Sequence, residues 1–173
     1  MSVVTTPEGP LPGEVVILRQ WQAADARWYV DSRDEEVFRW TKEPRNLTVE
    51  ATRAAIKAVG SSATAVALAI ADRHTGELLG NIALKLANGY REGEVMYWLA
   101  PGARGRGAAT DGVRTIVAWA FDTLPLDRIE LYTNPGNIRS QRVAIRAGFE
   151  PRGERERRQY FVLTRDEFER RPD

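Results

Sequence analysis

The sequence has no cysteine, and its 173 residues include a single histidine, His74. A chain without thiols forms no disulfide, no thiolate metal site and no cysteine-based covalent intermediate. One histidine is too few for a histidine-rich metal centre or a serine–histidine relay, so we expect no metal. The chain also lacks an apolar run of membrane-spanning length and a basic-then-apolar signal pattern. We therefore expect a cytoplasmic protein without membrane contact.

The sequence also lacks an excess of basic or of acidic residues. The 25 Lys and Arg residues nearly balance the 24 Asp and Glu residues, giving a net charge of +1, so no nucleic-acid partner is expected. The length and the hydrophobic content of 43% suffice for one domain with its own core. Residues 1–13 contain three prolines and two glycines and predict a flexible N-terminal arm. Residues 14–173 are expected to form the single domain.

One stretch, residues 94–109, combines a strand, a glycine-rich turn and the start of a helix. The alternating strand pattern ends at Pro101, the turn contains Gly105 and Gly107, and a long helical pattern opens at Ala108. Glycine lets a backbone approach a ligand closely, and the N-terminus of a helix carries a partial positive charge. The stretch therefore predicts a cradle of backbone N–H groups for a phosphate.

Two common phosphate loops do not fit this stretch. A Walker loop needs Lys and then Ser or Thr after its last glycine, whereas Ala108 and Ala109 follow Gly107. The dinucleotide fingerprint needs a third small residue where Thr110 stands, and a preceding βαβ unit. The pattern that does fit is Arg104-x-x-Gly107-x-Ala109, which resembles the acyl-CoA pyrophosphate loop of the GNAT superfamily of N-acetyltransferases. By itself, such a turn is equally consistent with a plain surface loop.

The order of predicted elements extends the resemblance to most of the chain. Strands are predicted over 15–19, 63–71, 78–86, 94–99, 128–133, 149–155 and 159–164, and helical segments over 21–32, 35–40, 49–59, 108–123 and 140–147, before a polar tail at 166–170. The GNAT fold has this order, with the cradle after the fourth strand. The resemblance implies an α/β (α+β) fold: a twisted, mostly antiparallel sheet of about six or seven strands, splayed between strands four and five, with about four flanking helices.

A second motif points to a subgroup of that family. Asn134-x-x-Asn137-x-x-Ser140 is followed by the run Ala147-Gly148-Phe149, which is similar to acetyltransferases of the RimJ/RimL type. The resemblance implies transfer of an acetyl group from acetyl-CoA to a primary amine, by direct attack in a ternary complex. The acceptor is either a protein N-terminus or a small-molecule amine, and the sequence does not separate these two.

By resemblance, backbone groups and a few side chains would hold the cofactor. The cradle would meet the pyrophosphate, and the main chain of Trp98, Leu99 and Ala100, at the end of the fourth strand, would pair with pantetheine. An N–H near Leu99 would polarise the thioester carbonyl. The cofactor-binding residues expected are Trp98, Leu99, Ala100, Arg104, Gly105, Arg106, Gly107, Ala108, Ala109, Asn134 and Asn137. For Arg104 and Arg106, solvated side chains are an equal alternative, and Asn137 also suits a helix cap.

Two side chains are the catalytic candidates. Glu94 would remove the amine proton through a water molecule, with Glu92 as a weaker substitute. Ser140 would hydrogen-bond the departing sulfur, a role the resemblance assigns to this position. The alternatives are a Glu94 that caps the strand end in solvent or pairs with a neighbouring arginine, and a Ser140 that caps its helix. Tyr132 and Tyr160 are the other candidate hydroxyls.

Several expectations concern partners. An acidic cluster around the second helical segment, Asp31, Asp34, Glu35 and Glu36, would attract a cationic amine unless it is simply a solvated face. A homodimer stays open. The competing function is that of a catalytically silent acyl-CoA-binding regulatory protein, which would keep the cradle without transferring the acetyl group.

Overall fold

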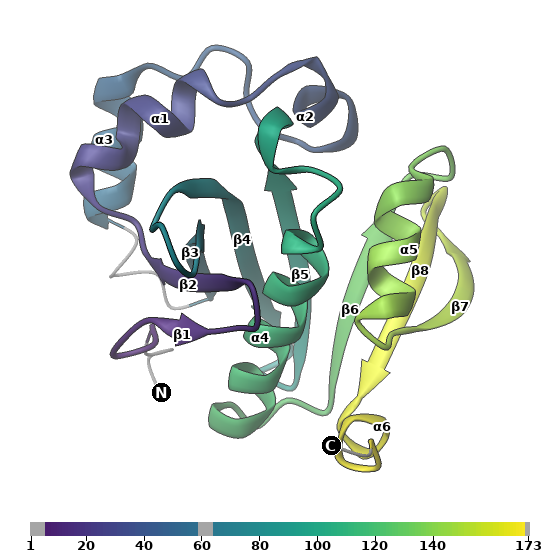
Figure 1. Ribbon diagram of the computed structural model, residues 1–173. Coiled ribbons are helices and arrows are strands. Elements are labelled where there is room, and N and C mark those ends of the chain that lie inside the picture. The colour runs from purple at the N-terminus through teal and green to yellow at the C-terminus, as the bar shows by residue number, and fades with distance from the viewer. Residues whose placement is uncertain (1–5, 59–63, 172–173) are drawn as a thin grey trace.

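The computed structural model describes residues 6–58 and 64–171, and it is built around one eight-stranded sheet (Figure 1). The strands are β1 (Leu11–Pro12), β2 (Val16–Gln20), β3 (Ala65–Asp72), β4 (Leu78–Ala87), β5 (Glu92–Leu99), β6 (Arg128–Thr133), β7 (Glu150–Arg155) and β8 (Arg158–Thr164). Seven of them are the strands that periodicity predicts. The eighth, β1, is too short to give a periodic signal.

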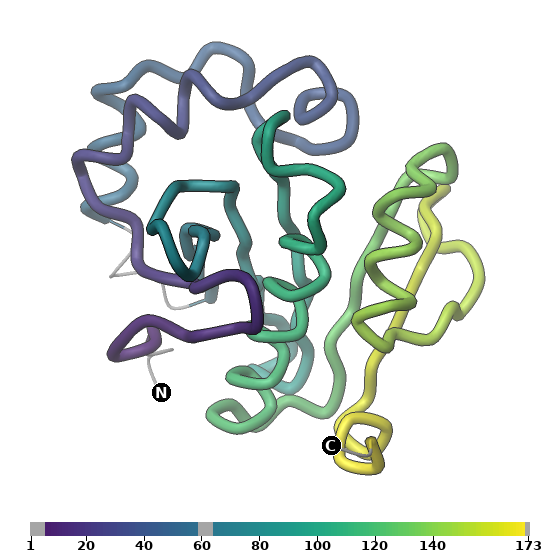
Figure 2. Tube along the Cα trace, viewed as in Figure 1, coloured from purple at the N-terminus to yellow at the C-terminus, as the bar shows by residue number. Residues whose placement is uncertain are grey.

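The sheet runs in the order β1-β2-β3-β4-β5-β6-β8-β7. Every neighbouring pair is antiparallel except β5 and β6, which are parallel. These two strands pair only at their beginnings, through Glu92↔Arg128, Gly93↔Ile129 and Glu94↔Glu130. Beyond Glu94 they diverge, and the tube in Figure 2 shows the space between them widening toward α2. The mostly antiparallel sheet with splayed central strands is therefore confirmed.

Within residues 6–58 and 64–171, six α-helices flank the sheet. They are α1 (Ala26–Asp31), α2 (Glu35–Trp40), α3 (Val49–Ala58), α4 (Ala108–Thr123), α5 (Ile138–Arg146) and α6 (Arg165–Glu169). The predicted polar tail is thus partly helical, because Thr164 and Glu167 form a capping box that starts α6. Val59, which the third helical prediction includes, and Ala63 of the second predicted strand lie outside the described residues. In the described part of the chain, none of the helices is both long and apolar enough to cross a membrane.

The hydrophobic core lies between the sheet and the pair α4 and α5. One face of α4 is fully buried, and it packs with inward side chains of the central strands, including Ile82, Val95 and Ile129. Since Val95 and Ile129 face this core, the alternate residues of β5 and β6 face the opposite side of the sheet. Side chains from both faces of the sheet therefore border the space where β5 and β6 part.

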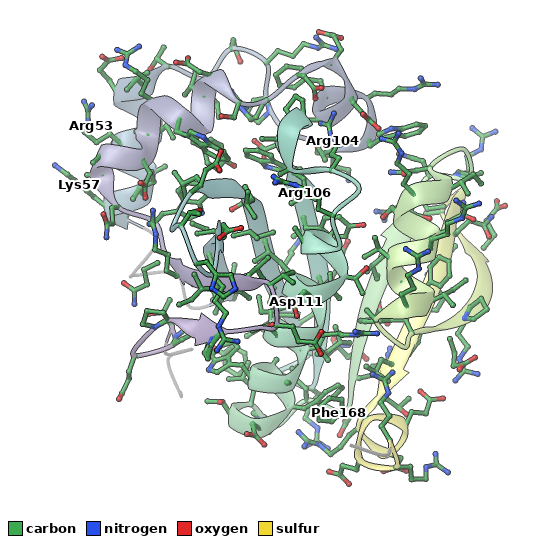
Figure 3. The ribbon with its side chains drawn as sticks, in the orientation of Figure 1. Arg53, Lys57, Arg104, Arg106, Asp111 and Phe168 are labelled. Carbon is green, nitrogen blue, oxygen red and sulfur yellow. The ribbon has the colours of Figure 1, made fainter. Side chains whose placement is uncertain are left out.

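A buried carboxylate anchors part of the predicted N-terminal arm. Asp111, on the first turn of α4, accepts hydrogen bonds from the backbone N–H groups of Glu14, Val15 and Val16 at 2.8–3.0 Å. This anchoring holds the turn between β1 and β2, so that Leu11–Pro12 can pair with β2. Figure 3 shows Asp111 pointing from α4 toward this turn. Residues 1–5 of the predicted arm lie outside the described residues.

Candidate active site

A cleft of ≈ 620 Å³ opens where β5 and β6 part. Its wall is formed by residues of α2, of β4, β5, β6 and β8, of the first turn of α4 and of the first half of α5. Of the predicted site residues, the wall includes Glu94, Trp98, Leu99, Arg104, Gly105, Ala109, Asn134, Asn137 and Ser140. Ala100, Arg106, Gly107 and Ala108 are not among the wall residues. One cleft thus brings together the cradle, the strand edge and both catalytic candidates.

The predicted cradle has the geometry of an anion-binding turn. Gly105 and Gly107 have φ values of +76° and +81°, a left-handed conformation that favours glycine. Gly107 is the N-cap of α4 and has no side chain that could cap the first turn. The first backbone hydrogen bond of the helix is donated by the Asp111 N–H to the Gly107 carbonyl. Within the described chain, no group accepts the backbone N–H groups of residues 105–110. These donors remain available to an anionic ligand.

Arg104 serves the turn in a different way from the predicted phosphate contact. Its guanidinium donates to both carboxylate oxygens of Asp34 at 2.7 and 2.8 Å, to Glu36 at 2.8 Å and to the Leu99 carbonyl at 3.0 Å. The hydrogen bonds from Arg104 lower the pKa of Asp34 to about 2, so the pair stays ionised at any pH above that value. Arg104 therefore ties the cradle to the N-terminus of α2. In Figure 3, Arg104 and Arg106 extend from the same turn, and Arg106 is exposed.

Three of the four residues of the acidic cluster, Asp34, Glu35 and Glu36, pair with arginines. Besides binding Arg104, Glu36 lies 3.3 Å from Arg139 of α5, and Glu35 pairs with Arg45. With their charges balanced, these carboxylates do not provide the uncompensated negative surface that would attract a cationic amine. Asp34 and Glu36 are also more than a solvated face of the helix, because both hold Arg104 in place.

The alternation of β5 decides which main-chain groups face the open edge. The Ala100 N–H donates to the Leu79 carbonyl of the neighbouring chain segment at 2.8 Å, so Ala100 points toward β4. The main-chain groups of Trp98, two residues earlier, also point toward β4, and the Trp98 carbonyl lies against Gly80. Tyr97 and Leu99 therefore present their main-chain groups to the space between β5 and β6. The Leu99 carbonyl already accepts Arg104, which leaves its N–H directed into the cleft.

Glu94 stands at the point where the two strands separate. It is the last residue of β5 that pairs with β6, and its cross-strand partner on β4 is Lys85. Its carboxylate lies 3.9 Å from the guanidinium of Arg158, and 29% of the side chain is exposed. The predicted pairing with an arginine is thus present but long, and the carboxylate also lines the cleft.

The other catalytic candidate has a partner that the sequence pattern does not reveal. The hydroxyls of Ser140 and Tyr97 lie 2.9 Å apart. Asn137, not Ser140, is the N-cap of α5, because the Asn137 side chain accepts the Ser140 N–H at 3.2 Å. This leaves the Ser140 hydroxyl free of a capping role. Burial raises the pKa of Tyr97 to about 12, so the phenol keeps its proton and can donate to Ser140.

The alternative hydroxyls belong to a separate network. Tyr132 and Tyr160 stack with ring centroids 5.0 Å apart, and both donate to the buried carboxylate of Glu130, at 2.9 and 2.7 Å. Burial alone would raise the pKa of Glu130, but hydrogen bonds from Tyr160, Arg128 and Tyr132 outweigh it and lower the pKa. Since Glu130 and Glu94 are register partners, this network lies on the Glu94 side of the sheet, away from Ser140.

One further polar group faces the cleft without a protein partner. Thr133, at the end of β6, is 3% exposed and lines the cleft, and its hydroxyl has no hydrogen bond within the described chain. The neighbouring Asn134 lines the cleft as well, and its carbonyl accepts the Asn137 N–H at 2.9 Å. A buried hydroxyl without a partner costs free energy unless a ligand satisfies it. Sequence reasoning gave no signal for Thr133.

The family described as Acetyltransferase (GNAT) domain matches residues 16–150. Because this match covers most of the chain, the protein belongs to the GNAT acetyltransferase family. The family prediction from the cradle and the Asn-x-x-Asn-x-x-Ser motif is thereby confirmed.

Individual relatives share parts of the sequence or the whole fold. The chain is 35% identical over 77 residues to "Putative ribosomal N-acetyltransferase YdaF" of Bacillus subtilis (strain 168), a match that covers 44% of this chain and 42% of that protein. An acetyltransferase of the GNAT family from Bacillus anthracis superposes with a TM-score of 0.78 at 18% identity, covering 91% of this chain and 99% of that one. Mycobacterium smegmatis RimJ, in complex with CoA-disulfide, superposes with a TM-score of 0.76 at 23% identity, covering 92% and 87%.

Proposed function

We propose that the protein transfers the acetyl group of acetyl-CoA to a primary amine by direct attack within a ternary complex. The observation that carries this proposal is the single cleft that joins the free N–H groups of the cradle, the open edge of β5, Glu94 and the Ser140–Tyr97 pair. The solved RimJ neighbour was captured with a CoA-derived ligand, which supports a CoA site in this fold.

We assign each step to a group of the cleft or the cradle. The cradle amides hold the pyrophosphate, the main chain of Tyr97 and Leu99 pairs with the pantetheine amides, and the Leu99 N–H polarises the thioester carbonyl. Glu94 accepts the proton of the attacking amine, directly or through one water molecule. The new C–N bond forms as the C–S bond breaks. The departing thiolate is stabilised by a hydrogen bond from Ser140 and then takes a proton from solvent.

The test is a calorimetric titration with acetyl-CoA and CoA, followed by a thiol-release assay with a panel of primary amines. We expect both ligands to bind, and thiol release to depend on the amine. Binding without thiol release for any amine would favour the silent CoA-binding alternative. Failure of both ligands to bind would overturn the assignment.

Removing the Tyr97 hydroxyl tests the sulfur-side hydrogen bonds. In Tyr97→Phe, Ser140 loses its donor, and we expect kcat to fall about tenfold with little change in acetyl-CoA affinity, the size of one hydrogen bond lost in the transition state. Ser140→Ala should lower kcat by at least as much, and the double variant should be no worse than Ser140→Ala alone, because the two hydroxyls act in series. A larger loss in Tyr160→Phe than in Tyr97→Phe would contradict this assignment.

Thr133→Val separates ligand binding from stability. The hydroxyl has no hydrogen-bond partner among the described residues, so we expect valine to leave the free energy of unfolding unchanged or to raise it by up to about 1 kcal/mol. If the hydroxyl serves the cofactor, acetyl-CoA affinity should fall about fivefold. Thr52→Val is the matched control: Thr52 is also buried, but it donates to the Thr48 carbonyl at 2.9 Å, so this change should cost stability and spare affinity. Unfolding midpoints and calorimetry measure both, and unaltered affinity in Thr133→Val would remove Thr133 from the site.

A further inference from the structure

The cleft wall carries more basic than acidic side chains. It has two acidic residues, Glu36 and Glu94, and five basic ones, Lys42, Lys85, Arg104, Arg139 and Arg158. Each of the three arginines has a carboxylate partner within 4 Å. Neither lysine forms an ion pair with any residue of 6–58 or 64–171. The cleft therefore holds two uncompensated positive charges.

Lys85 is too far from the cradle to serve the phosphates. It pairs in register with Glu94, whereas the cradle follows Leu99, five residues further along β5. At strand spacing this separation is roughly 17 Å. Lys85 also shares the Glu94 face of the sheet, with Arg158 approaching the same carboxylate from β8. Its charge thus falls on the part of the cleft where Glu94 would receive the acceptor amine.

These positive charges affect an arriving amine in two ways. Like charges disfavour the ammonium form, which helps the amine to reach Glu94 in its neutral, nucleophilic state. They also repel an acceptor with several positive charges and attract one with a carboxylate close to its amine. The neutralised acidic residues of α2 offer no compensating attraction for a cation.

We propose that the acceptor is a primary amine that carries a carboxylate nearby, and that Lys85 binds this carboxylate. The inference rests on the proposed acetyl transfer and narrows its substrate class. An acidic peptide N-terminus and a free amino-dicarboxylate share the required chemistry. A polyamine or a polycationic small molecule lacks it.

The experiment compares matched acceptors in the thiol-release assay. The peptides Ser-Asp-Glu-Ala, Ser-Asn-Gln-Ala and Ser-Lys-Arg-Ala differ in charge at similar size, and free aspartate, aspartate diamide and spermidine form the small-molecule set. Each is tested on wild type, Lys85→Gln and Lys57→Gln. Lys57 is the matched control, because it lies on α3 outside the cleft wall, and Figure 3 shows it on the far side of the molecule from Arg104.

We expect wild type to prefer the carboxylate-bearing acceptor of at least one set. Lys85→Gln should raise KM for that acceptor about tenfold with little change in kcat, and Lys57→Gln should not. The set that shows the preference identifies the source of the carboxylate. Equal or faster turnover of neutral or cationic acceptors would overturn this inference while the proposed acetyl transfer stands. Absence of thiol release with every amine would overturn both.

Discussion

Replacing Gly107 with valine is expected to weaken acetyl-CoA binding at least about 100-fold, because the cradle loses several charge-assisted hydrogen bonds worth about 1.5–3 kcal/mol each. Apart from the two chain neighbours of Gly107, no atom of the described residues lies within 4 Å of the position that a Cβ would occupy there. The new side chain would therefore enter open space at the turn that carries the free N–H groups, without displacing the core. Valine also disfavours the φ of +81° that this turn requires.

The matched control separates ligand loss from backbone strain. Gly76, in the turn between β3 and β4, has a φ of +73° and likewise no atom within 4 Å of an added Cβ. Gly76→Val should therefore cost a similar stability, about 1–2 kcal/mol, without affecting acetyl-CoA binding. Calorimetry and thermal unfolding of both variants measure the two effects. If Gly107→Val still bound acetyl-CoA as tightly as Gly76→Val, residues 105–110 would not be the pyrophosphate site.

The features that could be predicted from the sequence are the local ones. The cradle follows from two glycines and a helix start within four residues, and the Asn137–Ser140 relation follows from one helical turn. The residues of such short segments determine the dihedral angles and helix caps themselves, so their local structure can be predicted from the sequence alone. The splay and the strand order came from the family resemblance, since periodicity alone does not fix which strands pair.

The features that could not be predicted from the sequence are side-chain contacts between segments far apart in the chain. Tyr97 meets Ser140 across 43 positions, and Arg104 meets Asp34 across 70. These contacts depend on strand register and on where α2 packs, which composition and spacing do not encode. The same holds for β1, whose two residues pair only because Asp111 binds the following turn from about 95 residues away. Sequence reasoning located the candidate residues but not the side chains that orient them.

Replacing Glu94 with glutamine is expected to lower kcat about 100- to 1,000-fold, the range for loss of a general base. Glutamine keeps the size of the side chain but accepts no proton, and acetyl-CoA affinity should stay near that of wild type. The deficit should also depend on pH. As the pH rises through about 8, where an α-amino group becomes neutral, the acceptor needs no base and the variant should recover activity.

Glu92→Gln is the control that isolates the base. Glu92 lies two residues earlier on the same face of β5, pairs with Arg128 at 2.7 Å and is not part of the cleft wall. This variant tests whether loss of an ion pair on that strand is enough to reduce activity, and we expect kcat to change less than about threefold, because the Glu92 carboxylate lies outside the cleft wall. Steady-state kinetics from pH 6 to about pH 9, with saturating acetyl-CoA, compares the three proteins. A Glu94→Gln deficit that stays constant across this range would indicate that Glu94 positions Arg158 rather than accepting the amine proton.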